Sequence, residues 1–117
     1  MAITLQQAAD ALAQALRDSE ESQSYRALRE QVMADETNKA LLKEYQKTQT
    51  ALQMAAMAGK EADAEAVERF SRLSGLLYMN GEISQYLMAQ LRLQKLTGEL
   101  FQQMAKAAGL EMDLPGM

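Results

Sequence analysis

The chain has 117 residues and a formal net charge of −4, and although 48% of it is hydrophobic, only 5% is aromatic. This length suits one domain, and the acidic balance argues against bulk binding to nucleic acid or to an anionic membrane. The chain has no cysteine and no histidine, which excludes disulfides, thiolate nucleophiles, zinc sites built on those residues and Ser-His-Asp triads.

The amino-acid usage is typical of an all-helical protein, with nine methionines, one proline and many Ala, Leu, Gln and Glu residues. The N-terminal sequence lacks the basic region and apolar core of a signal peptide. No apolar run approaches the roughly 18 residues that a membrane span requires. We therefore expect a cytoplasmic protein with no membrane partner.

Two helices are predicted in the N-terminal third. The first begins after Thr4, which can form a capping box with Gln7. Its apolar stripe comprises Leu5, Ala8, Ala9, Leu12, Ala15 and Leu16. The second helix follows Ser19, with acidic residues in its first turn, where the helix dipole favours them. Its narrow buried face comprises Tyr25, Leu28 and Val32.

A helical hairpin is predicted next. Asp35 is placed to cap a third helix over about 36–58, and Gly59 to end it. The short polar linker 59–63 suits an antiparallel connection, and Asp63 can cap the fourth helix. The predicted buried residues are Leu41, Leu42, Tyr45, Leu52, Ala55 and Ala56 on the third helix, and Val67, Phe70, Leu73 and Leu77 on the fourth.

The fifth predicted helix, over about 81–108 and capped by Asn80, is the longest. Its roughly 28 residues would span about 42 Å, more than the width of a compact globule of this chain length. Its apolar residues cover roughly 220° of the helical wheel, whereas packing on one partner needs only about 100°. We therefore predict an elongated, dimeric, all-α bundle of five helices, with one helical domain over 1–110 and a flexible tail over 111–117.

A contact surface is predicted around this fifth helix. Gln90, Gln94 and Thr97 form a polar column above Phe101, which is either a hydrogen-bonded seam with a second subunit or the wet edge of an ordinary helix contact. Methionines on otherwise polar helix sides are typical of adaptable binding surfaces, although they can also be merely tolerated there. The predicted dimer or partner interface comprises Ile83, Leu87, Gln90, Leu91, Gln94, Thr97, Phe101, Met54, Met57 and Met88.

Two charged clusters are candidates for chemistry. Lys39, Lys43 and Lys47 form an i, i+4, i+8 ridge that could bind anions or the phosphates of a nucleic acid, or could be a solvated helix face. The carboxylates of residues 61–68 could hold a divalent cation, but arginines follow them and neither an EF-hand loop nor a Glu-x-x-His motif is present. We predict no catalytic residue, no cofactor and no metal.

Several positions together resemble the YlbF/YmcA family of small bacterial helical proteins, over about residues 5–110. They are Ser19-Glu20 before Tyr25, Asp35 ahead of Leu41-Leu42 and Tyr45, Gln49 with Leu52, and Asn80 followed by Ile83, Tyr86-Leu87 and Leu96. The resemblance implies an all-α homodimer, or an assembly with paralogues, that has a regulatory role and no enzymatic activity. Better-known members of the family form a complex that modulates ribonuclease Y and so mRNA processing.

This sequence departs from those members because it lacks a longer C-terminal extension and has no cysteine for the iron–sulfur cluster that some family complexes carry. It is more similar to the short YheA-like subgroup. The expected function is a non-enzymatic adaptor or regulatory protein whose partners are itself, paralogues or ribonuclease Y. The alternative is a nucleic-acid-binding module that uses the lysine ridge. Of the two, we favour the adaptor, which does not contact nucleic acid directly.

Overall fold

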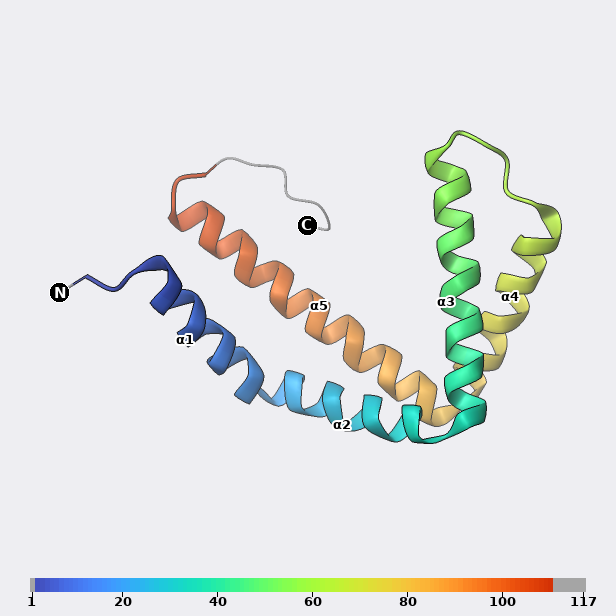
Figure 1. Ribbon diagram of the computed structural model, residues 1–117, viewed down its shortest axis with the longest axis horizontal. Coiled ribbons are helices and arrows are strands. Elements are labelled where there is room, and N and C mark those ends of the chain that lie inside the picture. Colours follow the sequence, from blue (N-terminus) through green and yellow to red (C-terminus); the bar gives the residue numbers. More distant parts are fainter. Residues whose placement is uncertain (1, 111–117) are drawn as a thin grey trace. The chain divides into compact units, whose positions relative to one another are not determined.

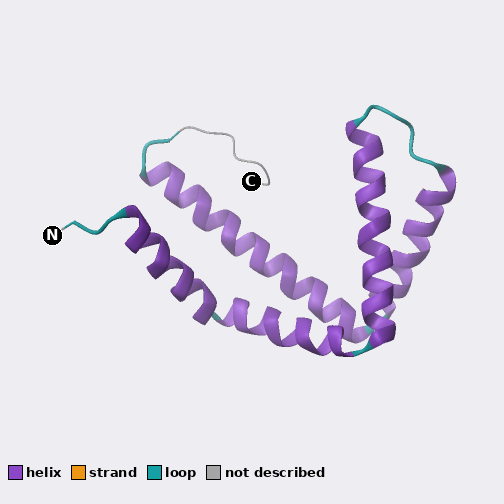
Figure 2. Ribbon diagram, in the orientation of Figure 1, coloured by secondary structure: helices purple, strands orange, loops and turns teal. Residues whose placement is uncertain are grey.

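The computed structural model describes residues 2–110, and within that range the chain forms five α-helices and no strand (Figure 1, Figure 2). The helices are α1 (Leu5–Asp18), α2 (Glu20–Ala34), α3 (Glu36–Met57), α4 (Ala64–Met79) and α5 (Gly81–Ala107). The all-α fold class and the five predicted helices are confirmed, with α3 and α5 the two longest. The tail over 111–117 lies outside the described residues.

Three of the four breaks between helices consist of one residue each: Ser19, Asp35 and Asn80. Each of the three has an extended backbone, and its N–H donates a hydrogen bond of 3.2 Å to the carbonyl three residues earlier. Its side-chain oxygen then accepts hydrogen bonds of 2.9 to 3.2 Å from backbone N–H groups in the first turn of the next helix. One capping residue thus ends one helix and begins another.

The other predicted helix ends are also confirmed. The hydroxyl of Thr4 accepts from the Gln7 amide at 3.0 Å, and the Gln7 side chain accepts from the Thr4 amide at 2.9 Å, which completes the capping box. The Asp63 carboxylate accepts from the Glu65 amide at 3.3 Å. Gly59 follows α3 with a φ of 72°, a left-handed conformation that glycine adopts without steric cost.

The chain groups into two compact units. Unit 1 contains α1, the start of α2 up to Ala27, and α5 from Met88 onward. Unit 2, Leu28–Leu87, contains the rest of α2, all of α3 and α4, and the first residues of α5. The single domain over 1–110 stays a prediction.

Unit 2 has its core around the antiparallel hairpin of α3 and α4 (Figure 1). The rings of Tyr45 and Phe70 stack across it with centroids 5.1 Å apart. Two residues predicted to be buried, Ala56 and Val67, are exposed, because they lie in helix turns beside the hairpin loop, where no other element covers them. The side chains of Val32, Leu42, Leu77 and Ile83 are fully buried.

Unit 1 buries less. Its part of α5 lies alongside α1 and the start of α2 (Figure 1). Ala89 is 3% exposed, and it shares one side of α5 with three half-buried leucines. Helix α1 is strongly amphipathic, yet it contains no buried residue, and Leu5 is 92% exposed. The predicted apolar stripe of α1 is therefore present in the sequence but left largely uncovered.

Candidate interaction surfaces

A buried amide network joins the start of α3 to the break between α4 and α5. Asn38 is 7% exposed and its side-chain oxygen accepts from Nδ2 of Asn80 at 2.8 Å. Its own Nδ2 donates to Oε2 of Glu82 at 3.1 Å. Because Oδ1 of Asn80 caps α5 at the same time, the network fixes the first turn of α5 against α3.

This network was not predicted from the sequence. The available signal was that Asn38 lies four residues before Leu42, on the buried face of α3. The second buried polar residue on this helix, Thr48, donates to the Glu44 carbonyl at 2.9 Å. Over residues 2–110 every side-chain nitrogen or oxygen that is completely shielded from solvent has a hydrogen-bond partner. Of these buried polar groups in unit 2, the amide network links different helices, whereas the Thr48 bond lies within α3.

The predicted surface residues of α3 are exposed. Lys39, Lys43 and Lys47 are all exposed to solvent. Lys39 and Lys43 directly follow the buried residues Asn38 and Leu42. Their role in binding an anion stays a prediction. Near the C-terminal end of α3, two methionines expose most of their surface: Met54 is 66% and Met57 is 88% exposed.

In unit 1, α5 has one covered and one uncovered apolar side. Ala89, Leu93, Leu96 and Leu100 are buried or half-buried, and they fall within roughly 60° on the helical wheel. Leu91, roughly opposite the centre of that arc, is 62% exposed. Other apolar side chains outside the arc are also open to solvent: Met88 is 51%, Phe101 53% and Met104 50% exposed.

The polar column of α5 lies beside this uncovered side. Gln90 and Thr97 are half-buried, whereas Gln94 is exposed. The Thr97 hydroxyl donates to the Gln94 carbonyl at 3.0 Å, a bond within the helix itself. A cross-subunit role for these residues stays a prediction.

Ile83 requires a correction. We predicted that it contacts a partner, but its side chain is 0% exposed and belongs to the core of unit 2. The physical reason is the cap, because Asn80 holds the first turn of α5 against its own chain. Leu87, the next predicted interface residue, is half-buried.

The acidic stretch before and within α4 contains a structural residue, since Asp63 caps that helix. Over residues 2–110, no three or more carboxylates gather closely enough to hold a metal ion. None of the helices in the same range combines the length and the apolar character needed to cross a bilayer.

Comparison with known proteins identifies the family. The sequence model described as "Control of competence regulator ComK, YlbF/YmcA" matches residues 5–107. The chain belongs to the YlbF/YmcA family. Among curated members, the UPF0342 protein YheA of Bacillus subtilis is 35% identical over 100 residues, which cover 86% of this chain and 86% of YheA. A UPF0342 protein of Symbiobacterium thermophilum is 33% identical over 107 residues, 92% of this chain and 94% of that protein.

Two solved structures share the fold of this YlbF/YmcA protein. A protein of unknown function (DUF964) from Bacillus stearothermophilus has a TM-score of 0.79 at 23% identity, and the match covers 90% of this chain and 92% of that one. Bacillus subtilis RicA, solved in complex with RicF, has a TM-score of 0.65 at 20% identity and coverages of 90% and 93%. The predicted resemblance, including its YheA-like character, is confirmed.

Proposed function

We propose that this YlbF/YmcA protein is a non-enzymatic adaptor or regulatory subunit that acts through protein–protein contacts and forms a homodimer. The proposal rests on the uncovered apolar side of α5, where Leu91 and Phe101 expose 62% and 53% of their surface. Burying the exposed part of one such side chain stabilises a complex by about 1–2 kcal/mol, a little over half of the value for a fully exposed side chain. A partner helix laid along this side would therefore supply favourable binding energy.

Two further observations support the proposal. Helix α1 is amphipathic and buries none of its residues. RicA, which shares the fold, was solved in complex with RicF. We extend this behaviour to the present chain, with a second copy or a paralogue as partner. By family resemblance, we place the resulting assembly in the cytoplasm and assign it the modulation of ribonuclease Y-dependent RNA processing.

The dimer is tested by placing charges on the uncovered side of α5. Leu91→Glu combined with Phe101→Glu should convert the dimer to a monomer in analytical ultracentrifugation, because each change would bury a carboxylate in the interface. Gln102→Glu with Gln103→Glu is the matched control, since it adds the same charge at exposed polar positions of the same helix. A wild-type chain that stays monomeric at high micromolar concentration, with intact helicity, contradicts the homodimer.

The regulatory role is tested by a cross-linked pull-down of the tagged protein from its native host. Recovery of ribonuclease Y or of paralogous helical proteins, lost in the Leu91→Glu and Phe101→Glu variant, supports the role. Recovery of the chain alone supports only the dimer and counts against the regulatory assignment.

The second candidate function is nucleic-acid binding, favoured by the exposure of all three ridge lysines. Three phosphate contacts to single-stranded RNA predict that log K falls with log salt concentration with a slope of about −2. The binding should vanish when Lys39, Lys43 and Lys47 are changed to glutamate. Absent or salt-insensitive RNA binding rejects this function.

A further inference from the structure

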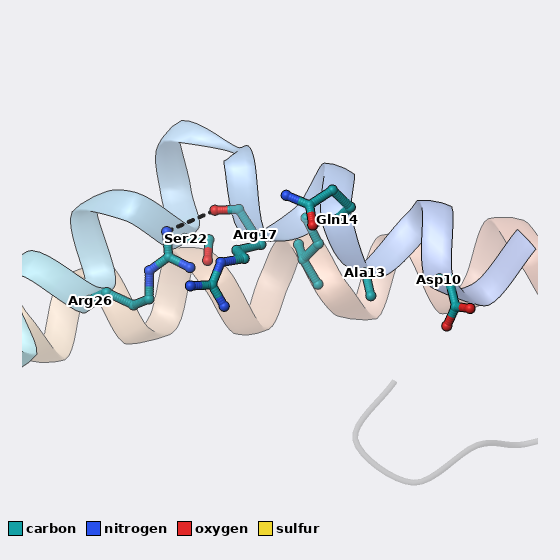
Figure 3. A pocket seen from close by; sticks show the side chains of 7 residues that line it. Asp10, Ala13, Gln14, Arg17, Ser22 and Arg26 are labelled. Carbon is teal, nitrogen blue, oxygen red and sulfur yellow. Dashed lines mark hydrogen bonds between the residues drawn. The ribbon is translucent and has the colours of Figure 1, made fainter. Parts of the chain in front are cut away.

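An open cavity of about 520 Å³ lies at the break between α1 and α2 in unit 1 (Figure 3). Two arginines and a serine line one end of it: Arg17 from the last turn of α1, and Ser22 and Arg26 from the first two turns of α2. The proposed contact surface on α5 contributes none of these three residues. The cavity therefore represents a separate candidate site.

The one-residue break at Ser19 brings these side chains together. Nη2 of Arg26 donates to the Arg17 carbonyl across the break at 2.9 Å, which fixes this side chain over the end of α1. Figure 3 shows the guanidinium groups of both arginines turned toward the Ser22 hydroxyl. Two positive charges and a hydroxyl donor thus face the same space.

Within residues 2–110, Arg26 donates to a neutral carbonyl, and neither guanidinium forms an ion pair with a carboxylate. The nearby carboxylates accept from neutral amides, Asp18 from Gln14 at 3.1 Å and Asp10 from Gln6 at 2.9 Å, and so they keep their negative charges. Neighbouring like charges without a counterion favour the binding of an anion.

Ser22 adds a third donor. Its residue is 9% exposed and its backbone N–H donates to the Ser19 hydroxyl at 3.2 Å. The Ser22 hydroxyl makes no hydrogen bond to any residue between 2 and 110, and it lies in the cavity wall beside both arginines (Figure 3). It is therefore placed to donate to a bound oxygen.

We propose that Arg17, Ser22 and Arg26 form a binding site for the phosphoryl group of a small phosphomonoester. A phosphate dianion matches the two guanidinium charges, and its oxygens can accept from two planar donor forks and from the hydroxyl at once. A carboxylate has one charge and two oxygens, which a single arginine already satisfies. The cavity volume of about 520 Å³ falls in the range that holds small molecules.

Asp10 defines the other end of the ligand. It lines the same cavity, seven residues before Arg17 and therefore about 10 Å along α1. A second anionic group would be repelled there, whereas hydroxyl or amino groups could donate to the carboxylate. A phosphorylated sugar has this distribution of acceptors and donors.

The site is tested by NMR titration of the full-length, ¹⁵N-labelled protein with inorganic phosphate and with ribose 5-phosphate. Saturable shifts at the Ser22 amide and at the Arg17 and Arg26 Nε groups, tighter for ribose 5-phosphate, support the proposal. Shifts with inorganic phosphate alone restrict the site to the free anion and overturn the phosphomonoester. Equal shifts with sodium chloride at matched ionic strength, or no saturable shift, overturn the site itself.

Variants separate this site from general charge effects. Arg17→Gln should weaken binding at least about tenfold, because charge-assisted hydrogen bonds to the phosphate are lost. Ser22→Ala should weaken it less, and it provides a second test if Arg17→Gln loses helicity. Arg29→Gln is the matched control, since it removes the same charge at an exposed position outside the cavity. Equal weakening by Arg17→Gln and Arg29→Gln overturns the proposal.

Discussion

Replacing Asn38 with alanine removes the centre of the buried amide network in unit 2. The side chain is 7% exposed, accepts from Asn80 at 2.8 Å and donates to Glu82 at 3.1 Å. Alanine can make neither bond, and it leaves the Asn80 amide without its acceptor. We expect a large loss of stability from a substitution that changes no charge.

The size of the loss follows from the two hydrogen bonds. The bond between the two asparagines is neutral and is worth about 0.5–1.5 kcal/mol. The bond to the Glu82 carboxylate is charge-assisted, and we take about 1.5 kcal/mol, the lower end of its range, because Glu82 is exposed. With the small cavity that alanine leaves, the free energy of unfolding should fall by about 2–4 kcal/mol. The melting temperature should then drop by about 10–20 °C.

The assay is urea unfolding followed by circular dichroism, at one fixed protein concentration so that any dimer contributes equally. Gln46→Ala, at an exposed position of the same helix, is the matched control and should change stability by less than about 0.5 kcal/mol. A double-mutant cycle with Asn80→Ala should give a coupling of about 1 kcal/mol, because the cycle cancels the separate loss of the α5 cap. A loss for Asn38→Ala no larger than that of Gln46→Ala refutes the reasoning.

Two further predictions concern backbone and ring geometry. Gly59→Ala should destabilise the protein by about 1 kcal/mol because the φ of Gly59 is 72°, whereas Gly75→Ala, inside α4, should stabilise it by about 0.5–1 kcal/mol. A Cβ added at either site has nothing within 4 Å, so urea unfolding should report backbone effects alone. A change in the free energy of unfolding that has the same sign in both variants would contradict this prediction. For the stacked rings of Tyr45 and Phe70, a double-mutant cycle to leucine should give a coupling of about 0.5–1.5 kcal/mol, and a coupling near zero would show that the rings contribute only through burial.

The helix boundaries could be predicted from the sequence because helix capping is local chemistry. Thr4, Asp35, Asp63 and Asn80 each bond to backbone groups two or three residues away. Such contacts depend on residue type and short spacing, both of which can be read from the chain. The predicted ends of α3 and α5 accordingly differ from the structure by one residue each.

The coverage of each helix face could not be predicted in the same way. Periodicity shows which residues share a side of a helix, but not which element lies against that side. The sequence pattern predicts apolar contacts both for the leucines of α1 and for Ile83. In the structure, however, Leu5 is 92% exposed and Ile83 is fully buried. The decisive contacts, from Asn38 to Asn80 and Glu82, join residues 42 and 44 positions apart.

The candidate phosphoryl site was missed for a related reason. Arg17 and Arg26 lie on two helices, and neither fits a spacing motif. Their meeting depends on the direction in which the chain turns at Ser19, and this direction is set by an extended backbone with φ −63° and ψ 151°. The sequence pattern predicts that a helix break occurs at Ser19, but it does not predict the angle between the two helices.

The one-residue breaks also determine where the chain can change in length. Each residue of an α-helix turns the following side chains by about 100°, so an insertion beside Ser19, Asp35 or Asn80 would rotate every later side chain of that helix away from its neighbours. The loop between α3 and α4 has no such constraint, because it is exposed and several residues long. Insertions and deletions among natural variants, and engineered tags or reporter groups, should therefore concentrate between Gly59 and Asp63.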